Sequence, residues 1–89
     1  EEVRIFKALC NEVRLEIVKA LLDGEKYVSE IIPYAGRMQP AVSMQLAKLE
    51  FLGIVKSRRE GGRVYYSLAD ERIKEIISKI FKVISEENR

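Results

Sequence analysis

Residues 39–68 read QPAVSMQLAKLEFLGIVKSRREGGRVYYSL, a segment that changes character at Gly53. Before this glycine the apolar residues recur at helical spacing, and after it residues 54–59 and 63–68 have the composition of two short strands. Residues 60–62, Glu-Gly-Gly, supply the positive φ angles that a tight hairpin turn needs. A helix that runs directly into a basic hairpin is typical of a winged helix-turn-helix. The predicted fold class is therefore α+β, mostly α, with a two-stranded β-hairpin wing.

The predicted helix has two unlike faces. Val42, Leu46, Leu49 and Leu52 fall on one side of a 3.6-residue spiral. The other side carries small or hydrogen-bonding groups instead of the long charged side chains of an ordinary solvent face. Such groups can donate to and accept from base edges in a DNA groove. The residues predicted to face bases are Gln39, Ala41, Ser43, Met44 and Gln45.

Three shorter helices are expected upstream of this segment. The first covers about residues 3–10, and Asn11 is placed to cap a second helix that Gly24 closes. A third is expected over residues 28–35, with Ser29 as its cap and with Pro33 tolerated or distorting it. Residues 36–38 then form the turn of a helix-turn-helix pair, in which the third helix braces the groove-reading helix.

Basic residues are concentrated around the same segment. Residues 37–63 hold six basic and two acidic side chains, a local charge of +4 within a total of +2, so the remainder of the chain is −2. DNA phosphate is the anion that best explains such a concentration. The alternative is an edge hairpin that carries charges only to prevent pairing with other sheets. The residues predicted to hold phosphates or a minor groove are Arg37, Lys48, Arg58, Arg59 and Arg63.

A last helix is predicted after Asp70, which can act as its cap. Its isoleucines recur at three- and four-residue steps in a stripe longer than one small core needs. We therefore expect the terminal helices to pack against a second copy of the chain, although a helix that only covers its own domain would show the same pattern. The predicted dimer residues are Val3, Ile5, Phe6, Ile73, Ile76, Ile77, Ile80, Phe81 and Ile84.

From about Phe6 through the final helix, the chain resembles the ArsR-type family of bacterial and archaeal winged-helix repressors. FKALCNEVRLEIVKALLDG, residues 6–24, resembles the opening of that family, and residues 39–68 resemble its recognition helix and wing. The resemblance implies a homodimeric transcriptional regulator, most often a repressor, and twofold symmetry implies an inverted-repeat operator. Two positions depart from the family pattern, since the family often has histidine where Gln45 stands and a capping serine where Met38 stands.

Many members of this family sense metals, but the ligands for such a site are absent here. The chain has no histidine, residues 26–30 contain no cysteine, and no imidazole follows Asp70. Because soft and borderline ions need several thiolate or imidazole ligands, we predict no metal site and no cofactor. Cys10 is interpreted as a small buried apolar residue, with a redox-active thiol as the alternative.

Composition limits the remaining function classes. With 89 residues, 47% hydrophobic and 34% charged, the chain is expected to form a single soluble domain over residues 1–89 without a membrane span. One cysteine fits a reducing compartment, so a cytoplasmic protein is expected. No nucleophile stands beside a base, so an enzyme is not predicted. Two rivals remain: a winged-helix protein-interaction module, favoured by an exposed apolar patch on the recognition helix, and a single-stranded or RNA-binding domain using Tyr65 and Tyr66.

Overall fold

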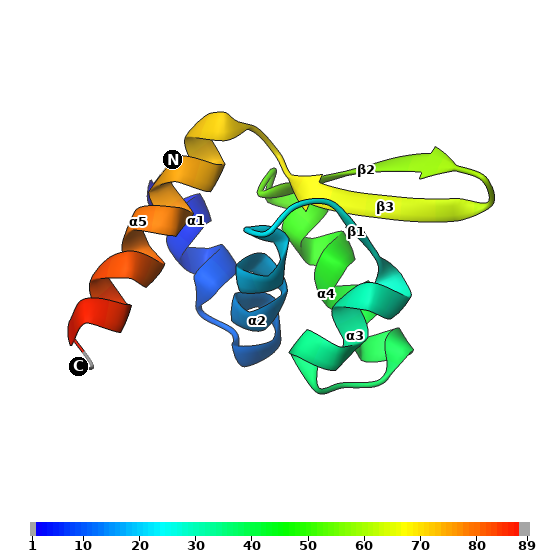
Figure 1. Ribbon diagram of the computed structural model, residues 1–89, viewed down its shortest axis with the longest axis horizontal. Helices are drawn as coiled ribbons and strands as arrows, with labels where there is room; N and C mark the ends of the chain where they lie inside the picture. The colour runs from blue at the N-terminus through cyan, green and yellow to red at the C-terminus, as the bar shows by residue number, and fades with distance from the viewer. Residues whose placement is uncertain (1, 88–89) are drawn as a thin grey trace.

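The computed structural model describes residues 2–87, and its elements follow the order expected of a winged helix-turn-helix (Figure 1). The predicted fold class is confirmed: helices precede a hairpin that extends away from them, and a last helix follows. The elements are α1 (Glu2–Leu9), α2 (Glu12–Leu21), β1 (Lys26–Tyr27), α3 (Val28–Ala35), α4 (Gln39–Phe51), β2 (Val55–Glu60), β3 (Arg63–Leu68) and α5 (Glu71–Glu87).

The sheet has one strand more than the predicted hairpin. Strands β2 and β3 pair antiparallel from Val55 opposite Leu68 to Glu60 opposite Arg63, and β1 adds to the outer edge of β3 in the order β1-β3-β2. The predicted two-stranded hairpin wing is confirmed as β2 and β3, and the third strand, β1, is an addition that the sequence analysis did not predict. A strand of two residues is too short to give an alternating pattern, so its pairing with β3 had no signal in the sequence.

Both side-chain caps expected for α2 and α5 are present. The Oδ1 atom of Asn11 accepts hydrogen bonds from the backbone N–H groups of Val13 and Arg14 at 2.9 and 3.0 Å. The Oδ1 atom of Asp70 accepts from the N–H of Ile73 at 2.8 Å. These bonds satisfy donors that the first turn of a helix leaves unpaired, and each such cap typically contributes about 1 kcal/mol to stability.

The ends of α2 and α3 differ from the expectation. Ser29 lies within α3 and is not its cap, because the helix begins one residue earlier and Tyr27 occupies the N-cap position. The Glu30 carboxylate accepts a hydrogen bond from the N–H of Tyr27 at 3.1 Å. Helix α2 ends at a right-handed Leu22, and Gly24 follows two residues later with a φ of 132°. Gly24 thus serves the turn beyond α2 and does not close the helix itself.

One hydrophobic core holds the helices and the base of the hairpin together. Every helix contributes at least one buried side chain to it, so each element depends on its neighbours for stability. The buried residues of this cluster are Ile5, Ala8, Ile17, Val18, Leu21, Ile31, Ala35, Val42, Leu46, Leu49, Ile54, Val55, Leu68, Ile73 and Ile77.

The apolar stripe of α5 is divided between this core and the surface. Ile73 and Ile77 of α5 and Ile5 of α1 are buried within the protomer, with exposures of 2%, 0% and 6%. Their predicted place in a dimer interface is wrong, because almost no surface of these side chains remains to be covered by a partner. The first half of α5 completes the protomer's own core. This agrees with the alternative interpretation of the stripe, in which the helix covers its own domain.

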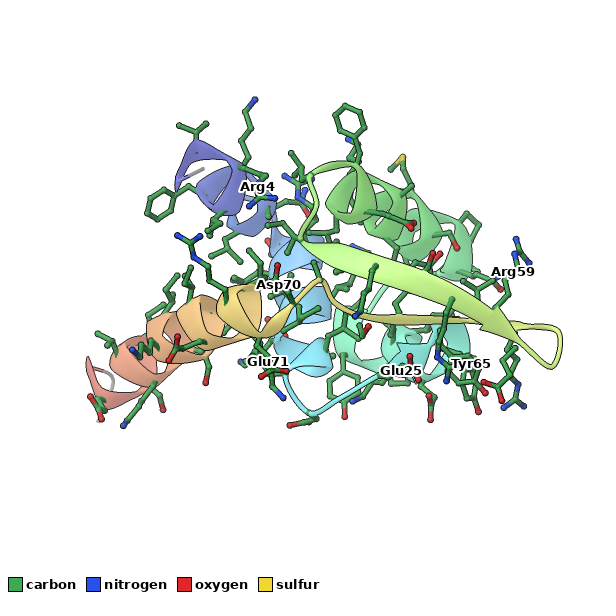
Figure 2. The ribbon with its side chains drawn as sticks, turned by 90° about the horizontal axis from the view of Figure 1, so that it is seen from above. Arg4, Glu25, Arg59, Tyr65, Asp70 and Glu71 are labelled. Carbon is green, nitrogen blue, oxygen red and sulfur yellow. The ribbon has the colours of Figure 1, made fainter. Side chains whose placement is uncertain are left out.

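Other predicted dimer residues remain accessible. Val3 and Phe6 of α1 are 67% and 60% exposed, and Ile84 of α5 is 48% exposed, as is its neighbour Val83 at 57%. Ile76, Ile80 and Phe81 are half-buried. Helices α1 and α5 lie at the end of the molecule opposite the hairpin tip in both views (Figures 1 and 2). The structure therefore leaves an unpartnered apolar surface at this end.

Candidate nucleic-acid interface

Helix α4 presents a polar face because its other face is fully used by the core. Val42, Leu46 and Leu49 have no exposed surface. On the opposite side Gln39 and Ser43 are exposed, Met44 is 53% exposed and Ala41 is half-buried. Four of the five residues predicted to face bases therefore keep accessible surface. Their contact with bases stays a prediction.

Gln45 does not lie on this face. It is 8% exposed, and its side-chain oxygen Oε1 accepts a hydrogen bond from Nη1 of Arg14 at 2.8 Å. The prediction that Gln45 faces bases is wrong for a reason already contained in the spacing. Position 45 is three residues after Val42 and four before Leu49, and residues at these separations share one side of a helix.

Arg14 was not predicted to have a role, yet its side chain joins three helices. This α2 side chain donates from Nε to the carbonyl oxygen of Ala8 at 3.2 Å and from Nη2 to that of Lys7 at 2.9 Å, at the carboxyl end of α1. Its third contact is the one with Gln45 of α4. Nothing in the spacing of the chain identifies this partner, because residues 14 and 45 meet only in the folded structure.

One of the wing arginines, Arg58, forms ion pairs within the protein. Arg58 binds the Glu25 carboxylate through two hydrogen bonds, from Nε at 2.8 Å and from Nη2 at 2.7 Å, and also pairs with Glu60. The hydrogen bonds from Arg58 lower the pKa of Glu25 below its ordinary value, so this carboxylate is ionised at neutral pH. The guanidinium also lies 4.6 Å from the ring centroid of Tyr65. Two carboxylates therefore compete with phosphate for Arg58, and its predicted phosphate contact stays a prediction.

The other predicted phosphate contacts remain accessible. Among the described residues, no ion pair involves the exposed side chain of Arg59, which leaves the hairpin on the side opposite Glu25 and Tyr65 (Figure 2). Arg63 is exposed and its guanidinium stacks 4.2 Å from the ring centroid of Tyr27. Two further cations flank α4: Lys48 is exposed on its last turns, and Arg37 lies 3.6 Å from a solvated Glu12 carboxylate. A pair so exposed contributes little and leaves Arg37 able to bind another anion.

Two apolar side chains are exposed near the carboxyl end of α4. Phe51 is 91% exposed, and it lies seven residues after Met44 and therefore on the same side of the helix. Together with Lys7, Lys48 and other neighbours these residues line an open hollow of about 600 Å³. This patch has the chemistry that would favour a protein partner, although cations are interleaved with it.

The tyrosines of the wing do not form an open stacking surface. Tyr66 packs against the hydrophobic core, and Tyr65 is half-buried with its ring edge-on to Tyr27 at a centroid distance of 5.6 Å. Binding of single-stranded nucleic acid relies on aromatic faces that are free to stack on bases. The geometry of Tyr65 and Tyr66 thus gives no support to that rival function.

Cys10 is exposed, so its interpretation as a buried apolar residue is wrong. It follows the last residue of α1 in the short connection to α2, where the chain turns at the surface.

Within the part of the chain that the structure describes, no group of three or more histidine, cysteine, aspartate or glutamate side chains is arranged to hold a metal ion. In the same part, no helix is long and apolar enough to cross a bilayer.

The sequence matches a known family over the region that contains this interface. The family model described as "Bacterial regulatory protein, arsR family" matches residues 11–57. A probable mercury resistance operon repressor of Streptomyces lividans is 36% identical over 83% of the chain, and an uncharacterized HTH-type transcriptional regulator of Methanocaldococcus jannaschii is 42% identical over 85%. The chain spans 59% of the length of the first of these relatives and 86% of the second.

Solved structures share the fold closely. HlyU from Vibrio cholerae superposes with a TM-score of 0.85 at 35% identity, covering 92% of this chain and 89% of that one. A winged helix-turn-helix DNA-binding domain from Mycobacterium bovis, described as homodimeric, gives a TM-score of 0.87 at 35% identity and covers 97% and 80% of the two chains. At this level of identity the similarity extends beyond the fold to the family.

Proposed function

The chain belongs to the arsR family of bacterial regulatory proteins, and from this premise we propose that it is a homodimeric regulator of transcription that binds double-stranded DNA in a sequence-specific manner. The observation that carries the proposal is the outward face of the amino-terminal half of α4, which carries the polar Gln39 and Ser43 and is flanked by cations. We propose that it represses transcription. The relatives from Streptomyces lividans and Xylella fastidiosa are named as repressors, whereas the Vibrio cholerae relative is named as an activator.

In this proposal α4 enters the major groove and α3 braces it. Gln39 and Ser43 donate to and accept from base edges, and Ala41 and Met44 offer apolar contacts to the thymine methyl group. Sequence information would therefore come from the amino-terminal half of α4, as in other helix-turn-helix proteins. Gln45 is outside this set because it is buried.

Cations outside this set hold the phosphate backbone. Arg59 and Arg63 of the hairpin, with Lys48 and Arg37 at α4, are exposed on the elements that would flank the groove. Phosphate contacts fix register and contribute affinity that depends strongly on salt but little on sequence. The wing would thus add affinity while α4 supplies specificity.

The apolar end of the molecule supplies the dimer interface in this proposal. We propose that Val3 and Phe6 of α1, together with Val83 and Ile84 of α5, pack against the same surface of a second copy. A twofold dimer buries one patch on both subunits, and it would direct the two α4 helices to an inverted repeat.

No metal or other cofactor is part of the proposed function, and neither is catalysis. Relatives are named for mercury and cadmium resistance, but this chain has no histidine and a single thiol to offer as soft ligands. A regulator of this kind works where the chromosome lies, so we propose the cytoplasm as its compartment.

A protein-interaction module is the second candidate, and the exposed Met44 and Phe51 are the observation that favours it. Selection of bound duplexes from a pool of random DNA discriminates the two functions. We expect enrichment of an inverted repeat whose half-sites are centred about 34–36 Å apart, one helical turn. A pool without enrichment would favour the interaction module, and an enriched site without twofold symmetry would contradict the dimeric docking.

The accessible wing arginine should contribute affinity without sequence information. Replacing Arg59 by Gln should weaken binding to selected and unrelated duplexes alike and reduce the slope of log K against log salt by about one unit. Arg58→Gln is the matched control and should change this slope less, because Glu25 and Glu60 already neutralise Arg58. Equal changes in slope for both variants would mean that DNA displaces the two carboxylates.

The dimer interface is tested at Ile84, which is accessible and not part of the protomer's core. Ile84→Glu would bury a charge between the subunits, so light scattering should show a monomer with the helical circular dichroism of the parent, and DNA affinity should fall. Ser78→Glu, at an exposed position of the same helix, should remain dimeric. A dimer of unchanged mass in the Ile84 variant would remove this surface from the proposal.

A further inference from the structure

Arginines connect α1 to the groove-reading helix at two points. Arg14 holds the carbonyl groups of Lys7 and Ala8 at the end of α1 and, with the same guanidinium, the side chain of Gln45 in the middle of α4. Arg4 of α1 donates from Nη1 to the carbonyl oxygen of Leu52, which is the C-cap residue of α4, at 3.3 Å.

Each connection is built into the packing around it. Gln45 is 8% exposed, so its end of the hydrogen bond is shielded from water, while Arg14 is half-buried. At the second point, a Cβ atom at position 53 would lie 2.7 Å from Nη1 of Arg4, so a larger residue there would displace the end of this arginine side chain from its present position. Gly53 thereby serves the contact as well as the turn, where its φ is 75°.

These contacts join the two surfaces that the proposed function uses. Helix α1 carries Val3 and Phe6 of the proposed dimer interface, and α4 carries the proposed base contacts. Helix α1 packs chiefly against α2, and these arginine side chains add polar contacts from α1 to α4 beyond the core that both helices share. Hydrogen bonds to a charged group are directional and are stronger than neutral ones.

We propose that Arg14 and Gln45 are positioning residues that fix the orientation of the recognition helix relative to the dimer interface, and that they thereby determine which half-site spacing the dimer accepts. The proposal rests on the proposed function. In this role neither residue contacts a base: Gln45 acts through the placement of Ser43 and Gln39, and Arg14 acts through Gln45.

The half-site spacing that a dimer accepts is a sensitive readout of how rigidly the recognition helix is held relative to the dimer interface. Inserting one base pair between the half-sites moves one of them by about 3.4 Å and rotates it by about 35° about the DNA axis. A dimer whose recognition helices are held firmly loses contacts on such a duplex, whereas a dimer with looser helices adapts to it. A residue that only stabilises the fold would change affinity for both duplexes by the same factor.

The experiment measures the affinity of the purified protein for the duplex recovered by random selection and for the same half-sites with one base pair inserted or removed. The wild type should bind the altered duplexes roughly tenfold more weakly or worse, and Gln45→Leu should reduce this ratio to roughly threefold or less, as expected when a hydrogen bond to a charged group is lost. Preference for the bases within each half-site should be unchanged.

Three further variants keep the test independent of folding failure. Arg14→Lys retains the charge but not the three-way contact, and it should relax spacing as Gln45→Leu does. Gln45→Glu retains an acceptor for Arg14 and should keep the wild-type ratio. Arg72→Met removes an exposed arginine of α5 outside this junction and should also keep the ratio.

Two results would overturn the inference while leaving the proposed function in place: a wild-type spacing ratio in both Gln45→Leu and Arg14→Lys, or an altered base preference within the half-sites of Gln45→Leu. The first would mean that core packing alone holds α4, and the second that Gln45 reads bases. Failure of the wild type to bind any duplex would instead overturn the proposed function, and the inference with it.

Discussion

Three side chains of α4, Val42, Leu46 and Leu49, have no exposed surface, and their burial decides how this helix is presented to anything outside the protein. A helix fixed along one face can offer only the opposite face to a partner. That face holds Gln39 and Ser43. The hairpin begins immediately beyond the carboxyl end of the same helix, so the core that orients α4 also sets the position of the wing (Figure 1). Both parts of the proposed interface therefore depend on this packing.

Some of the positive charges on the wing hold the structure together, and others are left accessible to a ligand. Arg58 is engaged by Glu25 across the sheet, a contact that ties the hairpin to the segment between α2 and β1. Arg63 stacks on Tyr27 in the same region, whereas Arg59 leaves the hairpin on the other side (Figure 2). The local charge of the sequence thus overstates the charge available to a ligand. Neighbouring arginines of one strand serve different purposes because successive residues of a strand point to opposite faces.

The sequence predicted the fold and the exposed position of most of the candidate interface residues because these follow from local rules, whereas their contact with DNA stays a prediction. Helical periodicity located α4, and the caps at Asn11 and Asp70 were recognisable from residue type. Some failures were local, since the spacing from Val42 and Leu49 already placed Gln45 on the buried side of α4. Others concern contacts between residues distant in sequence. The pairing of β1 with β3 and the bond between Arg14 and Gln45 exist only after folding. Likewise, the pattern of isoleucines in α5 does not distinguish burial within the protomer from burial against a partner.

The proposed DNA-binding surface is tested most directly by mapping the residues that DNA contacts. Backbone amide resonances of isotopically labelled protein, followed by NMR during titration with the selected duplex, report each residue separately. We expect the largest shifts for residues 39 and 41–44 of α4 and for the hairpin around Arg59, with small shifts along the exposed side of α5. Shifts concentrated on α5, with those of residues 39 and 41–44 unchanged, would contradict the proposed surface.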